Sequence, residues 1–171
     1  ASSTALDPLV ANVEAGGGSS ARGASGSSTA FVAAALAVRT QRPVLLVTAH
    51  LDEADEAVAA LADLAERREC PAPVAMPALE SMPGEAIGAL DLLAERLGVV
   101  RALVEGRAPG ILVAPLPSLM QMVPGPALLP RILRILRAGD RVDPRALSEW
   151  LAEAGYSRAD AIESPGEFAV R

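Results

Sequence analysis

The segment GASGSSTA, residues 23 to 30, has several residue types of a phosphate-binding loop. In the pattern G-x-x-x-x-G-K-[ST], glycines let backbone amides wrap the phosphates, the lysine meets their charge, and the hydroxyl holds Mg²⁺. Here Ser28 stands at the second motif glycine, Thr29 at the lysine and Ala30 at the final hydroxyl position. We therefore predict a vestigial nucleotide loop that retains at most weak anion binding by its amides. Its residues are Gly23, Gly26, Ser27, Ser28 and Thr29.

Other side chains with possible chemistry stand alone or in solvated patterns. His50 follows an apolar run but is the single histidine, so a structural or solvated role is favoured over a ligand role. Cys70 follows Arg67 and Arg68, which we expect to lower its thiol pKa modestly. An ordinary surface or core thiol is nevertheless favoured over a reactive one. A solvated helix start is favoured over a metal site for the four carboxylates that fall within one helical turn. These are Asp52, Glu53, Asp55 and Glu56.

The last residues of the chain predict a turn followed by an extended segment. Pro165 and Gly166 are turn residues, and the alternation in GEFAVR places Phe168 and Val170 on one side. Glu167, Ala169 and Arg171 then share the other side. A strand with an exposed arginine suits recognition by a partner, although the residues alone favour an ordinary solvated edge charge.

Alternating helical and strand patterns predict an α/β fold with a parallel sheet. A loop at 15–28 leads into an Ala-rich helix, and Pro43 opens an apolar strand that ends at His50. Amphipathic helices are expected at 51–69 and at 85–105, the second interrupted near Gly98. Between them lies a short extended piece at 71–77, and a buried strand followed by a short helix is expected at 110–124.

The pattern changes near Gly125, where we place a domain boundary between residues 1–125 and 126–171. Beyond it, Asp143 is predicted to cap a helix with Pro144 at its first position, and Trp150 to anchor a core. The run RILRILR, residues 131–137, has the arginine spacing of a helix but the aliphatic content of a strand, and a strand is favoured.

Composition limits the classes of function that the chain can have. It has 51% hydrophobic residues, 2% aromatics, no lysine among its 15 basic residues, and a net charge of −6. Such a chain can bury an aliphatic core, but it offers few rings for stacking bases and no basic excess for phosphate backbones. We expect no DNA binding by this segment alone and no membrane span. With one cysteine, we expect no internal disulfide and a cytoplasmic location.

The stretch AGYSRADAIESPGEFAVR, residues 154–171, resembles one narrow family. It is similar to AGY-x-R-x-D-x-V-x-x-PGEFAVR in the N-terminal, UvrB-like module of bacterial transcription-repair coupling factors. In that family the pattern continues into GG-I-L-D-I-F-P, so we expect a fragment truncated within its second domain. The region 71–91 lacks the aromatic hairpin of UvrB, which favours the coupling factors over UvrB.

The resemblance implies a RecA-like domain with a degenerate nucleotide loop at 1–125 and part of a small α+β domain at 126–171. It implies a non-catalytic module that recruits UvrA to lesion-stalled RNA polymerase, with Arg171, Glu167 and Phe168 at the partner surface. No cofactor is expected in this segment, whereas ATP, Mg²⁺, DNA and RNA polymerase would be bound by other domains of the parent translocase. The alternative is a fragment of a nucleotide-dependent excision-repair subunit like UvrB, or of a DNA helicase.

Overall fold

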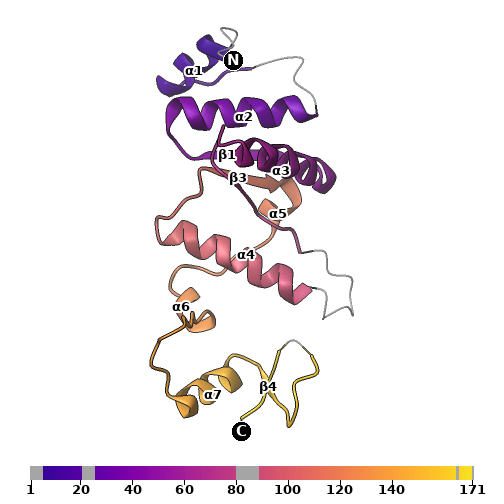
Figure 1. Ribbon diagram of the computed structural model, residues 1–171, viewed down its shortest axis with the longest axis vertical. Helices are drawn as coiled ribbons and strands as arrows, with labels where there is room; N and C mark the ends of the chain where they lie inside the picture. The colour runs from indigo at the N-terminus through magenta and orange to yellow at the C-terminus, as the bar shows by residue number, and fades with distance from the viewer. Residues whose placement is uncertain (1–5, 21–25, 80–88, 165, 171) are drawn as a thin grey trace. The chain divides into compact units, whose positions relative to one another are not determined.

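The computed structural model describes residues 6–20, 26–79, 89–164 and 166–170 (Figure 1). They form two compact units, of which the first holds the described residues of 6–79 and 92–122. The second holds the described residues of 123–170 together with the first residues of helix α4. Helices and strands alternate through the first unit around a parallel sheet, which confirms the predicted α/β class.

The sheet of the first unit has three parallel strands, β1 (Val44–Thr48), β2 (Pro73–Ala75) and β3 (Ile111–Pro115). Their order is β1-β3-β2, so β3 is central and all five of its residues are buried. Leu46 lies opposite Val113 in the pairing of β1 with β3. The continuous apolar run of β3 therefore forms the buried central strand, as expected for a parallel sheet between helices. The apolar run of β1 instead lies at an edge of the described sheet, where Leu45 and Val47 are exposed.

Helices α2 (Ser27–Thr40) and α3 (Leu51–Glu66) pack against this sheet and form the main core with it. The core is aliphatic and rich in alanine, whose small side chains let the two helices lie close together. Its buried members are Ala30, Ala33, Ala34, Ala37, Leu46, Ala54, Ala57, Leu61, Ile111 and Val113. Gly26 precedes α2 with a φ of 57°, a conformation that glycine adopts without the steric cost of a Cβ atom.

Helix α4 (Ala89–Val104) continues through Gly98 without a break, so the predicted interruption there is wrong. A single glycine costs a helix only about 1 kcal/mol relative to alanine, and the leucine, alanine, glutamate and arginine residues of α4 favour the helix enough to tolerate it. Helix α5 (Leu116–Met120) follows β3 directly, as predicted. No helix in the described ranges combines the length and the apolar character that crossing a membrane requires.

Helix α1 (Asp7–Glu14) was not predicted from the sequence. Its Val10 is buried, and Asp7 forms an ion pair with Arg39 of α2 in which oxygen and nitrogen are 2.6 Å apart. Pro8, in the first turn, has the φ that a helix start needs. The helix is short, and its position depends on contacts with α2 that no local pattern reveals.

The second unit contains helices α6 (Leu129–Ile132) and α7 (Pro144–Glu153) and the strands β4 (Ser157–Arg158) and β5 (Glu167–Phe168). The two strands pair in parallel, with Ser157 opposite Glu167. The predicted cap of α7 is confirmed, because the Asp143 side chain accepts a hydrogen bond from the Arg145 amide at 3.0 Å.

Two other predictions for this unit need correction. The run at 131–137 is not a strand, because Arg131 and Ile132 end α6 and the residues from Leu133 to Arg137 have no regular structure. Pro130 lies in the first turn of the short helix, and the aliphatic residues after the helix have no ladder partner in the described chain. Trp150 is half-buried instead of forming a core; its indole nitrogen donates to the Arg131 carbonyl oxygen at 3.2 Å.

Candidate functional site

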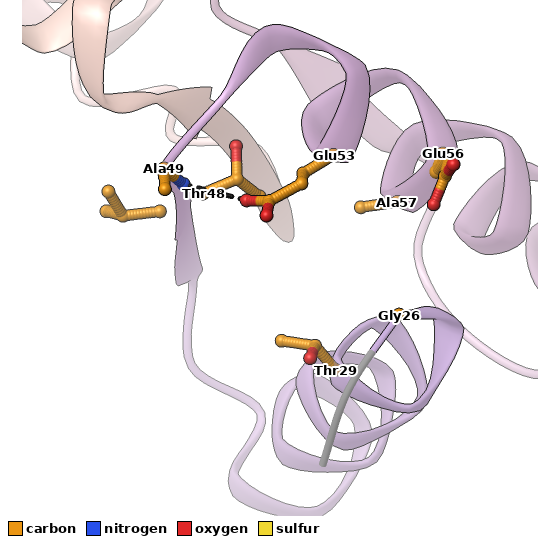
Figure 2. A pocket seen from close by; sticks show the side chains of 8 residues that line it. Gly26, Thr29, Thr48, Ala49, Glu53, Glu56 and Ala57 are labelled. Atoms are coloured by element: carbon orange, nitrogen blue, oxygen red, sulfur yellow. Dashed lines mark hydrogen bonds between the residues drawn. The ribbon is translucent and has the colours of Figure 1, made fainter.

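A hollow of about 440 Å³ lies at the carboxyl end of β1, between the start of α2 and the first turns of α3 (Figure 2). This is the edge of a parallel sheet at which α/β proteins commonly bind ligands. Its lining residues are Gly26, Thr29, Val47, Thr48, Ala49, Glu53, Glu56 and Ala57. Part of the predicted nucleotide loop therefore does face a pocket.

Only some residues of the predicted nucleotide loop line this hollow. Gly26 and Thr29 line the hollow, and the Thr29 amide donates to the Gly26 carbonyl oxygen at 3.2 Å. Ser27 and Ser28 form the first turn of α2, whereas Gly23 lies outside the described residues. The described part of the predicted loop thus contributes a helix start and one hydroxyl to the hollow.

The electrostatics of the hollow oppose an anion. Glu53 and Glu56 both contribute carboxylates to it, and its lining in the described chain includes no arginine. Figure 2 shows Glu53 reaching from α3 toward the end of β1, with Thr29 across the hollow. Two negative charges in this position disfavour the polyphosphate that a complete loop would hold, because like charges repel strongly at short range.

Polar groups at the carboxyl end of β1 also form hydrogen bonds that stabilise the fold. Glu53 Oε2 accepts hydrogen bonds from the amides of Ala49 at 3.0 Å and His50 at 3.4 Å, which caps the start of α3. The Thr48 hydroxyl donates to the His50 carbonyl oxygen at 3.0 Å. His50 is therefore the N-cap residue of α3, in agreement with its predicted structural role.

The carboxylates in the first turn of α3 likewise have a structural role. The Asp52 carboxylate accepts a hydrogen bond from the Glu53 amide at 3.0 Å. Among the residues that the structure describes, no group of three or more His, Cys, Asp or Glu side chains could hold a metal ion. The carboxylates of this turn complement the free amides at the start of a helix.

The expectation for Cys70 was wrong in its direction. Burial raises the pKa of the Cys70 thiol, and the nearby Glu69 carboxylate raises it further. The thiol is half-buried beside the core and lies 3.7 Å from the carbonyl oxygen of Leu61, to which it donates. Arg67 and Arg68 are exposed, so water screens their charge and desolvation dominates.

Arg96 is a buried cation that sequence reasoning missed. Its side chain is 2% exposed, and burial lowers its pKa from the ordinary value. Its guanidinium donates to the carbonyl oxygens of Pro77 at 2.9 Å, Ser118 at 2.7 Å and Gln121 at 3.0 Å. Arg96 therefore joins α4 to the chain that leaves β2 and to α5. The only available signal was one arginine among the apolar positions of a helix.

Two of the three predicted partner-binding residues, Glu167 and Phe168, form β5 of the second unit. The Glu167 carboxylate accepts hydrogen bonds from the amides of Glu163 at 2.8 Å and Ser164 at 3.1 Å, and these bonds lower its pKa. Phe168 is buried, with 8% of its surface exposed. Arg171 lies outside the described residues.

Exposed apolar side chains surround these strands in sequence. They belong to the motif at 154–171, but the sequence analysis did not single them out as a surface. Tyr156, immediately before β4, is 42% exposed, and Ile162, in the connecting loop, is 63% exposed. Val170, which was expected to share a face with Phe168, is 46% exposed. Contiguous apolar patches often mark the surfaces at which proteins bind partners, whereas single exposed apolar side chains are common.

These features define an α/β module with a small parallel sheet and a loop-to-helix hollow at its edge, followed by a small second unit. No family model matches the chain. It is 33% identical over 150 residues to the transcription-repair-coupling factor of Bacillus subtilis (strain 168). The match covers 87% of this chain but only 12% of the relative. The chain is therefore related to a segment of the transcription-repair-coupling factor, which confirms the resemblance found in the sequence.

Proposed function

We propose that this chain is a non-catalytic interaction module that recruits UvrA in transcription-coupled excision repair. The observation that carries the proposal is the 33% identity to a transcription-repair-coupling factor over 150 residues. Because the chain spans only 12% of that relative, the activity of a whole protein must involve much that these residues lack. ATP, Mg²⁺, DNA and RNA polymerase would be bound by other parts of such a protein, in the cytoplasm.

The first unit, in this proposal, is a UvrB-like, RecA-like domain whose nucleotide site has decayed. The support is chemical: no lysine follows the loop, and Glu53 and Glu56 line the hollow in which phosphates would lie. A magnesium–nucleotide complex would meet repulsion there instead of a cationic clamp. Calorimetric titration with ATP and Mg²⁺ tests this, and binding in the micromolar range would contradict it.

The second unit supplies the UvrA-binding surface in this proposal. Arg171 would contribute a charge-assisted contact, and the exposed Tyr156, Ile162 and Val170 would contribute apolar area. Glu167 and Phe168 would act mainly by shaping the turn and the strand pair, since the carboxylate of the first is bonded to backbone amides and the second is buried.

The decisive experiment measures binding of purified UvrA to this chain by calorimetry. We expect Arg171→Ala to weaken binding by roughly 1 to 3 kcal/mol, the scale of a lost charge-assisted contact. Arg42→Ala is the matched control, because Arg42 is exposed on the first unit, and it should leave binding unchanged. No detectable binding of UvrA, or equal losses in both variants, would contradict the proposed role.

A further inference from the structure

The second unit contains a series of exposed arginines that begins in α6 and ends in the first turn of α7. Arg131, Arg134, Arg137, Arg141 and Arg145 recur every three or four residues, and all five are exposed. Arg145 pairs with Glu149 at 3.1 Å, whereas the first four form no ion pair in the part of the chain that the structure describes. This concentration of positive charge occurs in a chain whose net charge is −6.

The two acidic residues within this run face the backbone. Asp140 Oδ2 accepts a hydrogen bond from the Arg137 amide at 2.8 Å, and Asp143 Oδ1 accepts one from the Arg145 amide at 3.0 Å. Each carboxylate thereby stabilises a turn or a helix start instead of pairing with a guanidinium group. The guanidinium groups of the first four arginines remain available to an outside partner.

Large aliphatic side chains alternate with these arginines. Ile132 is 37% exposed, Ile135 is 48% exposed and Leu136 is 49% exposed. The backbone from Leu133 to Arg137 has no regular structure, and Leu133 itself is extended, with φ −123° and ψ 125°. The segment thus presents cationic and apolar groups together on a stretch of chain whose backbone groups are not paired in a ladder.

We propose that residues 131–141, the arginine segment, bind an acidic protein segment that also carries aliphatic side chains. Guanidinium groups bind carboxylates with two parallel hydrogen bonds, and burial of the isoleucine and leucine side chains against a partner removes apolar surface from water. A nucleic acid is a poorer match. The arginine segment contains no aromatic residue on which a base could stack, and its aliphatic side chains would lie beside phosphates.

This inference does not depend on recruitment of UvrA, because it uses none of Arg171, Glu167 and Phe168. The test is fluorescence anisotropy of a fluorescein-labelled helical peptide built from glutamate and leucine, titrated with the 171-residue chain. We expect binding that weakens when NaCl rises from about 0.1 M to about 0.5 M, because salt screens exposed charges. The double variant Arg134→Glu with Arg141→Glu should bind roughly tenfold more weakly.

The matched control is the double variant Arg42→Glu with Arg67→Glu, which makes the same change of net charge on exposed residues of the first unit. It should bind the peptide almost as well as the unaltered chain does. A peptide with serine in place of leucine should bind more weakly, since the apolar half of the contact is then lost. Circular dichroism of each variant shows whether its fold is intact.

Three results would overturn the proposal. The first is no binding of the glutamate–leucine peptide at low salt. The second is an equal loss of binding in the two double variants, which would mean that only net charge matters. The third is tighter binding of a labelled DNA duplex than of the peptide, with loss of DNA binding in the Arg134 and Arg141 variant, which would make the segment a nucleic-acid surface.

Discussion

Single side chains in this protein show how environment decides the role of an ionisable group. Arg96 and Arg42 are chemically identical, yet one is buried among carbonyl oxygens and the other is exposed to water. Glu53 lies in a hollow where a phosphate-binding loop would need positive charge, and its carboxylate caps a helix instead. Residue type and spacing alone do not reveal the role of Arg96, because its acceptors lie 19, 22 and 25 residues away in sequence.

Replacement of Arg96 by methionine should destabilise the first unit. The apolar stem is retained, but the carbonyl oxygens of Pro77, Ser118 and Gln121 lose their donors. Leaving buried acceptors unpaired should lower the free energy of unfolding by roughly 1 to 3 kcal/mol. Urea unfolding followed by circular dichroism measures the loss. Arg42→Met, on the surface, should change the free energy of unfolding by less than about 0.5 kcal/mol. Equal effects of the two substitutions would refute the structural role of Arg96.

Cys70 should react slowly with iodoacetamide near neutral pH. Burial and Glu69 raise the pKa of its thiol, so the reactive thiolate is scarcer than in an ordinary cysteine. The rate should increase as the pH rises toward the elevated pKa. Mass spectrometry of the alkylated chain measures the rate, with the urea-unfolded chain as the reference. Equal rates in the folded and unfolded chains at neutral pH would show that the site does not protect the thiol.

At the scale of elements, patterns that depend on neighbours in sequence were predicted well. The apolar run of β1, the acidic start of α3 and the Asp143–Pro144 start of α7 are local signals, and all three elements form as expected. Elements that depend on contacts distant in sequence were predicted poorly. Helix α1 forms an ion pair with Arg39 of α2. No strand among the described residues pairs with the run at 131–137, as its aliphatic residues would need.

The effect of Gly98, which was expected to interrupt helix α4, on stability can be measured by substitution. Gly98→Ala should stabilise the first unit by roughly 0.5 to 1 kcal/mol, since alanine favours helix and an added Cβ meets nothing within 4 Å. Gly106→Ala, just beyond the same helix, should destabilise it, because Gly106 has a φ of 73°. Urea midpoints of the two variants compare them directly. A loss of stability in Gly98→Ala would mean that α4 is strained at that position.

At the scale of the whole molecule, the two units differ in how much apolar surface they bury. The main core lies entirely in the first unit, whereas the second buries only Leu129 and Phe168 among its described hydrophobic residues. Hydrophobic burial is the main favourable term in folding, so the second unit should be the less stable of the two. This asymmetry suits a unit that gains apolar contacts only when it binds a partner.

The single tryptophan makes this difference measurable, because Trp150 reports on the second unit while most helical signal comes from the first. During urea unfolding, tryptophan fluorescence should change at a lower concentration than circular dichroism does. Amide hydrogen exchange should likewise be faster in α7 than in α3 or β3, because opening of the second unit exposes less buried surface and costs less free energy. Coincident unfolding transitions with equal protection of α3 and α7 would instead mean that the two units unfold as one cooperative body.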